Sequence, residues 1–241
     1  PHRLNCKVIS VGNITLGGTG KTTLVEFIAK YLKQQGHKVA VLSRGYKRQR
    51  THNAERITQD AIMGDEPYML EMNLKDVPVI VDADRIRAAN FAISKYGVDT
   101  VILDDGFQQW KIAKDLEIVT IDANNPLGNR NLLPRGILRE PLSSLRRADL
   151  FVLTKTNLCT DTDIEKIKDE LNKLNSKGLV IESVHKPLGF YNIDKPEELF
   201  NGESLKEKTV TLFSGIGDPD SFENLIGSLG IKIGLSFRFS D

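Results

Sequence analysis

The chain has 241 residues, 40% of them hydrophobic, so it can bury a core of one large or two modest domains. A net charge of +1 gives no general basic footprint for nucleic acid, although it excludes neither nucleic acid nor a membrane surface. Cys6 and Cys159 lack metal-ligand spacing and a disulfide framework, no apolar run reaches the length of a membrane span, and no signal-peptide pattern occurs, which together favour a reducing cytoplasm.

The first candidate site is the stretch VGNITLGGTGKTTL at residues 11–24. The preceding segment, Lys7 to Val11, is rich in β-branched residues and predicts a strand. From Thr22 onward the apolar residues fall on one helical face, and Gly36 stands where a C-terminal cap belongs. A glycine-rich loop between a strand and a helix is the context in which Gly-Lys-Thr predicts phosphate binding.

Each part of this loop has a chemical role. The glycines let successive backbone N–H groups point at an anion, and the helix adds its positive N-terminal end. Lys21 would reach the β- and γ-phosphates, and the Thr22 hydroxyl would bind Mg²⁺. The alternative, an ordinary glycine-rich turn, is disfavoured by this context. The predicted nucleotide-binding residues are Thr15, Gly17, Gly18, Thr19, Gly20, Lys21, Thr22 and Thr23.

Further strand-like and helix-like runs alternate along the chain. This alternation predicts an α/β fold of the P-loop NTPase type, with a mostly parallel sheet covered by helices on both faces. After Pro187 the texture becomes shorter and richer in turns, so we divide the chain into a kinase-like core at residues 1–187 and a smaller C-terminal α/β subdomain at 188–241. The expected strands are 38–42, 77–81, 100–103, 117–121, 150–153, 179–183, 209–213 and 231–239, and the expected helices are 85–96, 163–174 and one beginning near Asp218.

The second candidate site is VILDDGFQQW at residues 101–110. An apolar strand that ends in acidic residues is where a nucleotide kinase keeps its second magnesium ligand. We therefore expect Asp104 or Asp105 to hold Mg²⁺ together with Thr22, directly or through water. The alternative is a polar cap between strand and loop.

The third candidate site is VPVIVDADRIRAA at residues 77–89. A carboxylate at the end of this strand, Asp82 or Asp84, would serve as the base for an acceptor hydroxyl, and Arg85 or Arg87 would hold a phosphate. Taken alone, the residues favour a simpler interpretation, in which Asp84 caps the following helix.

Two basic segments complete the candidates. Arginines alternate with leucine and isoleucine in a long irregular loop at residues 125–150, a composition suited to an anionic amphiphile or a membrane surface. The alternative is a solvated loop; without interleaved aromatics, nucleic-acid binding is disfavoured. The residues concerned are Arg130, Arg135, Arg139, Arg146 and Arg147, with Arg44, Lys47, Arg48 and Arg50 in the earlier segment 42–50.

Two shorter motifs bear on the fold and on the choice of nucleotide. GDEP at residues 64–67 predicts a helix start, with Asp65 as the N-cap and Pro67 in the first turn. LTKTN at residues 153–157 resembles the guanine-reading motif of GTPases, but Asn157 stands where the charged acceptor is required. This argues against guanine specificity and leaves adenine open.

Several motifs occur together in order: VGNITLGGTGKT, LSRGY, GDEP, DADR, LDDGFQ, NPLGNRNLLPRGILREPLSSLRRAD and LFVLTK. Together they resemble the tetraacyldisaccharide 4'-kinase family, the lipid A 4'-kinases of Gram-negative bacteria, over nearly the whole chain. The resemblance implies an ATP- and Mg²⁺-dependent kinase at the cytoplasmic face of the inner membrane. Such a kinase phosphorylates the 4'-hydroxyl of an acylated glucosamine disaccharide 1-phosphate to give lipid IVA.

By motif position, the resemblance also implies site residues. Asp84 in DADR becomes the candidate base, in place of the simple cap, and Arg139 and Glu140 in LREP become polar residues of the active site. The implied catalytic set is Asp84, Lys21, Asp105, Arg139 and Glu140, and the implied metal ligands are Thr22, Asp104 and Asp105.

Three departures from the family pattern leave alternatives open. Gln109 replaces the family's histidine after DDGFQ and cannot titrate. The family's hydrophobic N-terminal helix and its histidine-rich C-terminal segment are missing, so we expect a fragment with an incomplete C-terminal subdomain. The alternatives are a GTP-dependent switch or metallochaperone, an ATP-dependent ligase of a small cofactor precursor, and an ATP-binding remnant with weak catalysis.

Overall fold

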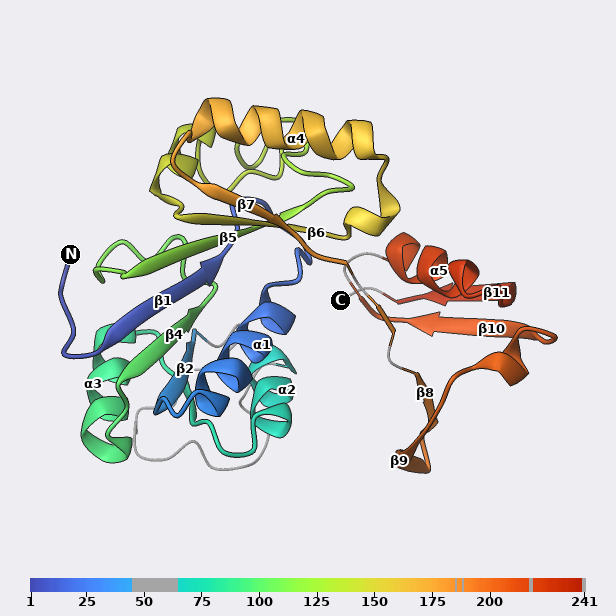
Figure 1. The fold of residues 1–241 in the computed structure, drawn as a ribbon, viewed down its shortest axis with the longest axis horizontal. Coiled ribbons are helices and arrows are strands. Elements are labelled where there is room, and N and C mark those ends of the chain that lie inside the picture. The colour runs from blue at the N-terminus through green and yellow to red at the C-terminus, as the bar shows by residue number, and fades with distance from the viewer. Residues whose placement is uncertain (45–64, 185, 188, 217–218, 240–241) are drawn as a thin grey trace.

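A seven-stranded parallel sheet forms the centre of the computed structural model, which describes residues 1–44, 65–184, 186–187, 189–216 and 219–239 (Figure 1). The strand order is β3-β2-β4-β1-β5-β6-β7, and every neighbouring pair is parallel. Parallel pairing places all carboxyl ends at one edge. The strands are β1 (Lys7–Gly12), β2 (Val39–Ser43), β3 (Val79–Val81), β4 (Thr100–Asp104), β5 (Leu116–Asp122), β6 (Leu150–Thr154) and β7 (Leu179–Glu182).

Helices cover both faces of this sheet, so its central strands are buried throughout. In β4, Val101 and Leu103 pack with α3 on one face, whereas Ile102 packs with α1 on the other. Strands buried on both faces read as continuous apolar runs, which is why the sequence predicted them clearly. The helices are α1 (Lys21–Gln34), α2 (Asp65–Asn73), α3 (Arg85–Tyr96) and α4 (Asp161–Leu174), with short 3₁₀ helices η1 (Leu142–Arg147) and η2 (Thr156–Leu158).

Beyond β7 the chain builds two smaller sheets, which extend to the right of the central sheet in Figure 1. An antiparallel hairpin is followed by a parallel pair of strands on which a helix packs. No strand of the described residues after β7 joins the seven-stranded sheet. The elements are β8 (Phe190–Asn192), β9 (Lys195–Phe200), η3 (Glu203–Leu205), β10 (Thr209–Ser214), α5 (Pro219–Ser228) and β11 (Lys232–Arg238).

The expected α/β class is confirmed, and most expected elements are found within two residues of their expected bounds. Helix α4 begins at Asp161 rather than Asp163, because the Thr160 hydroxyl caps it by accepting from the Asp163 backbone N–H at 3.2 Å. The hairpin β8–β9 was not predicted. The division at residue 187 stays a prediction, and Asp218, where the last helix was expected to begin, lies outside the described residues.

Candidate active site

The glycine-rich loop lies at the carboxyl end of β1 and leads directly into α1. Gly17 and Gly20 have φ angles of +108° and +80°, conformations that other residues adopt at a cost. A Cβ on Gly17 or Gly18 would meet nothing within 4 Å, so this part of the loop faces open space. Gly20 supplies no side-chain cap to α1, which leaves the first N–H groups of the helix available to an anion.

The two loop threonines upstream of Lys21 pack into the protein, and Thr19 is hydrogen-bonded to the neighbouring strands. Thr15 and Thr19 are buried, and the Thr19 hydroxyl lies 2.7 Å from the hydroxyl of Thr120 on β5. Thr154 on β6 donates to the Thr19 carbonyl at 3.2 Å. Contact of Thr15 and Thr19 with a nucleotide stays a prediction. Lys21, Thr22 and Thr23 form the first turn of α1.

The acidic pair stands at the carboxyl end of β4, the neighbour of β1, so it lies at the same edge of the sheet as the loop. Asp104 is buried and accepts a hydrogen bond from the Ser43 hydroxyl at 3.1 Å. Burial, with the nearby charge of Glu66, raises the pKa of Asp104 to about 6. Because few contacts offset the burial of this carboxylate, a bound cation would stabilise its charged form.

Asp105 is held by a paired arginine. Arg139 donates to both carboxylate oxygens of Asp105, at 2.6 and 2.9 Å. Burial acts to raise the pKa of Asp105, but the hydrogen bonds and charge of Arg139 outweigh burial and lower it. The φ angle of Asp105 is +51°, which is uncommon for a residue with a side chain.

Oxygen donors of the kind that Mg²⁺ prefers therefore gather at one edge: the carboxylates of Asp104 and Asp105 and the Thr22 hydroxyl. No group of three His, Cys, Asp or Glu side chains within the described residues could hold a metal alone. This donor set fits Mg²⁺, which in kinases is bound by one or two carboxylates together with substrate phosphates.

Asp84 caps α3 in the structure. Its Oδ1 atom accepts from the backbone N–H groups of Ile86 and Arg87, at 3.0 and 3.2 Å. The side chain is exposed. The cap that the residues alone favoured is thus present, and the role as a base stays a prediction.

The two arginines that open α3 are bound within the protein. Arg87 pairs with the carboxylate of Asp82 through two hydrogen bonds of 2.7 and 2.8 Å. Arg85 is buried and donates to the carbonyls of Asp82 and Asp104, so it ties the ends of β3 and β4 together. Burial lowers the pKa of Arg85 to about 10, which keeps it charged at neutral pH. These contacts within the protein disfavour the predicted phosphate binding by Arg85 or Arg87.

The long basic loop joins the glycine-rich loop through its backbone. Leu16 N–H donates to the Ile137 carbonyl at 2.8 Å, and Arg139 N–H donates to the Ile14 carbonyl at 2.7 Å. Buried Glu140 accepts from Arg147 at 2.8 and 3.1 Å. The structure therefore brings Arg139 and Glu140 to the site.

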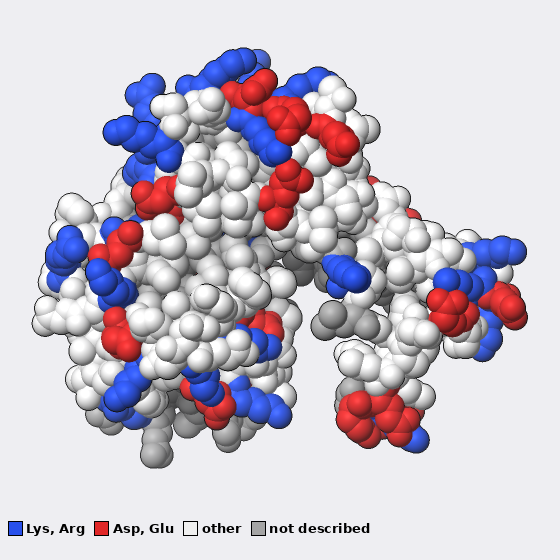
Figure 2. Space-filling model, viewed as in Figure 1, with Lys and Arg blue, Asp and Glu red and all other residues white. Residues whose placement is uncertain are grey.

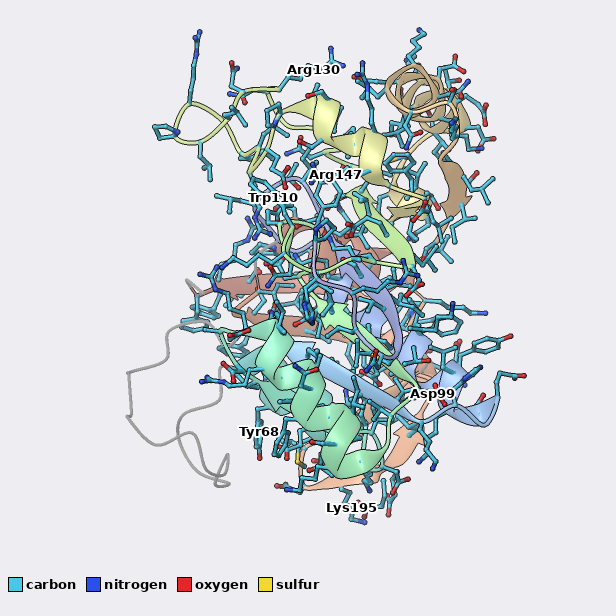
Figure 3. The ribbon with its side chains drawn as sticks, turned by 90° about the vertical axis from the view of Figure 1, so that its left-hand side faces the viewer. Tyr68, Asp99, Trp110, Arg130, Arg147 and Lys195 are labelled. Carbon is cyan, nitrogen blue, oxygen red and sulfur yellow. The ribbon has the colours of Figure 1, made fainter. Side chains whose placement is uncertain are left out.

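The outer arginines of this loop lie elsewhere. Arg130 pairs with Glu170 of α4, and Figure 3 shows it well beyond Arg147 and Trp110. Arg146 is exposed on η1. In the earlier basic segment, Arg44 is exposed, whereas Lys47, Arg48 and Arg50 lie outside the described residues.

Two buried polar groups at this edge make contacts that the sequence motifs did not predict. Asn13 is fully buried, donates to the Thr15 carbonyl and accepts from Arg139 at 3.2 Å, so it joins the two loops. Lys155, next to the anchoring Thr154, pairs with Asp122 at 2.6 Å. The signal for both was their position directly after a strand, which is weak without the pairing partners.

No helix among the described residues combines the length and the apolar character that a membrane span requires.

A glycine-rich loop, a Lys-Thr helix start and a facing acidic pair at one edge of a parallel sheet define a P-loop nucleotide-binding protein. The family model described as LpxK, tetraacyldisaccharide-1-P 4'-kinase, matches residues 1–241, and the chain belongs to that family.

Relatives and a solved structure agree with this assignment. The tetraacyldisaccharide 4'-kinase of Elusimicrobium minutum is 38% identical over all of this chain and 66% of its own length, and that of Halothermothrix orenii is 37% identical over all of this chain and 67% of its own. The LpxK of Aquifex aeolicus, solved in complex with ATP, matches with a TM-score of 0.74 and 33% identity over all of this chain and 73% of the other. The chain spans about two thirds of the length of its curated relatives.

Proposed function

We propose that this chain carries the phosphoryl-transfer site of an ATP-dependent kinase that phosphorylates the 4'-hydroxyl of a tetraacyldisaccharide 1-phosphate, the step of lipid A biosynthesis that gives lipid IVA. The observation that carries the proposal is the meeting of the glycine-rich loop, the acidic pair and Arg139–Glu140 at one edge of the sheet. Family membership supplies the substrate class.

The glycine-rich loop would hold the phosphates of ATP. Its open face at Gly17 and Gly18 leaves room for phosphate oxygens, and the N-terminus of α1 offers unpaired N–H groups. Lys21, the first residue of α1, would contact the β- and γ-phosphates and draw charge from the transferring group.

The acidic turn would hold Mg²⁺. Bound there, Mg²⁺ would neutralise charge on the β- and γ-phosphates. Asp104 and Asp105 would supply carboxylate oxygens, and Thr22 its hydroxyl. Arg139 keeps Asp105 in place by gripping both of its oxygens, and Glu140 shares this edge through its pair with Arg147.

Asp84 would take the proton from the attacking hydroxyl. Its Oδ1 atom caps α3, so the carboxylate is fixed in orientation while the residue stays exposed to a substrate. Fixing the base before the acceptor arrives reduces the entropy cost of the reaction.

The basic loop would contact the lipid substrate and the cytoplasmic face of the inner membrane. Leu132 and Leu133 are 44% and 47% exposed, and Arg130 and Arg135 lie close to them in sequence. Exposed leucines beside guanidinium groups suit an acylated anion at an interface. Figure 2 shows Lys and Arg side chains along the upper margin of the molecule, interspersed with acidic ones.

The test is transfer of label from γ-labelled ATP, with Mg²⁺, to tetraacyldisaccharide 1-phosphate in mild detergent, with Lys21→Ala as the control. Label in the lipid that is lost in the control supports the proposal. Tight ATP binding without transfer contradicts it and favours an ATP-binding protein without turnover. Cosedimentation with anionic vesicles tests the membrane contact separately, and competition between ATP and GTP tests the adenine preference that Asn157 favours.

A further inference from the structure

The backbone that follows the acidic pair is gripped by a buried lysine. Lys114 donates from its Nζ atom to the carbonyls of Gly106 at 2.7 Å and Phe107 at 3.3 Å. The same ammonium pairs with Glu117 at the start of β5. The side chains of Lys114 and Glu117 are only 10% and 6% exposed. These two carbonyls come directly after Asp104 and Asp105, and no function above accounts for the lysine.

The turn that Lys114 contacts begins with a residue in a left-handed backbone conformation, Asp105. At a φ angle of +51°, Asp105 has a left-handed conformation that is unfavourable for a residue with a side chain. Such a residue is retained only where its surroundings fix it. Arg139 fixes the carboxylate of Asp105, and Lys114 fixes the two peptide groups that follow.

The turn is closely packed by its neighbours. A Cβ on Gly106 would lie 2.4 Å from the Ser10 hydroxyl, and one on Gly12 would lie 2.5 Å from the Phe107 backbone nitrogen. Phe107 is fully buried. Since the residues on both carbonyls are buried, each carbonyl needs a donor from within the protein.

A second cation reaches the same turn from the basic loop. The Arg147 guanidinium lies 4.4 Å from the centre of the Phe107 ring and donates to the Phe107 carbonyl at 3.5 Å. Arg147 also pairs with Glu140, the neighbour of Arg139 in sequence. The turn is thus contacted by Lys114 and by Arg147, which is itself paired with Glu140. Arg139, next to Glu140 in the chain, binds the carboxylate of Asp105.

A buried lysine–glutamate pair is a poor source of stability. Apolar residues of similar size at such positions are often as stabilising or more so, because both charges lose their hydration. Burial lowers the pKa of Lys114 and raises that of Glu117, in keeping with this cost. The contacts of Lys114 with the turn indicate that the pair serves to hold the turn rather than to stabilise the fold.

We propose that Lys114 is a positioning residue that fixes the backbone after Asp104 and Asp105 and so sets the geometry of the magnesium-binding carboxylates, with Glu117 holding its ammonium group in place. The role rests on the proposed magnesium-dependent function. Lys114 touches neither substrate nor metal and acts through the two carbonyls.

The test measures Mn²⁺ binding by electron paramagnetic resonance in the presence of a non-hydrolysable ATP analogue, alongside thermal unfolding. The key variant is Lys114→Met with Glu117→Gln, which removes the ammonium without leaving a buried charge unpaired. Its Mn²⁺ affinity is expected to fall roughly 10- to 100-fold, the usual effect of losing a group that orients metal ligands. Binding of the analogue without metal should be unchanged. Lys114→Arg, which keeps the charge and donors, should restore most of the affinity.

The matched control is Lys166→Met, at an exposed position of α4 where the lysine pairs with Asp163. It should bind Mn²⁺ as the unaltered protein does. A folded Lys114→Met/Glu117→Gln variant with unaltered Mn²⁺ affinity overturns the proposal. If that variant does not fold, Glu117→Gln alone decides, and unaltered Mn²⁺ affinity there overturns it. Normal Mn²⁺ binding by the unaltered protein without phosphate transfer to the lipid contradicts the proposed kinase, and leaves the positioning role to be decided by the variants.

Discussion

Charged side chains near the amino ends of the central strands differ in solvent exposure from those near the carboxyl ends. At the amino ends, Asp115 meets Arg3 and Lys7 at 3.4 and 3.6 Å, and both basic side chains are more than 70% exposed. At the carboxyl ends, Asp104 and Arg85 are buried. Figure 3 shows Asp99, from the amino end of β4, far from Arg147 and Trp110.

The difference shows where charge serves function. Exposed pairs are worth roughly 0–1 kcal/mol, so evolution can gain or lose them at little cost. Buried charges lose hydration and are expensive, so the buried Asp104 and Arg85 at the carboxyl ends mark a candidate site. The raised pKa of Asp104 is one sign of that expense.

The largest effect is expected from Asp84→Asn, at the carboxyl end of the sheet. This substitution distinguishes a helix cap from a catalytic base. Asparagine caps a helix as well as aspartate does, so thermal stability should be unchanged. Phosphate transfer should fall roughly 10²- to 10⁴-fold, the usual contribution of a general base. Transfer at the unaltered rate would reduce Asp84 to the cap that the structure contains.

Lys21→Ala tests the glycine-rich loop. The loss of one charge that stabilises the transition state is expected to lower kcat roughly 10²- to 10³-fold. Lys30→Ala provides the matched control in the same helix, because Lys30 is half exposed and pairs only with Glu26 in the described contacts. Equal activity of the two variants would contradict phosphate binding at this loop.

Arg139→Lys tests the grip on Asp105. A lysine cannot make the two parallel hydrogen bonds of the guanidinium, so Asp105 should lose its fixed orientation. We expect the Mg²⁺ concentration for half-maximal transfer to rise roughly 10-fold or more. Arg3→Lys, at an exposed arginine that pairs with Asp115 at the amino ends of the strands, should leave that concentration unchanged; an equal rise in both variants would contradict the assignment.

The smallest effect is expected at the amino end, from Asp99→Asn. Burial acts to raise the pKa of Asp99, but hydrogen bonds from the Lys38 backbone and the Thr100 hydroxyl outweigh it and lower the pKa. A depressed pKa stabilises the fold above the unfolded value, near 4, and that contribution is lost as the pH falls through the folded pKa. Urea denaturation should show the variant less stable by under about 1 kcal/mol at pH 7 and by a smaller amount at pH 3. A gap that widens at pH 3 would reverse the sign.

The sequence by itself determined the sheet and the two motifs at its edge. Apolar runs such as 100–103 predict buried strands because both faces are covered, and the glycines with Lys21 carry their meaning locally. Parallel pairing then places Asp104 and the glycine-rich loop at the same edge of the sheet.

Only the tertiary structure decided which charges pair. Arg85 and Arg139 look alike in the sequence, yet one is buried against backbone carbonyls and the other grips Asp105 from 34 residues away. Lys114 is one lysine among many until its reach to Gly106 is known. Hydrogen bonds between residues distant in the chain depend on how the loops pack, and the periodicity of a sequence carries no record of that.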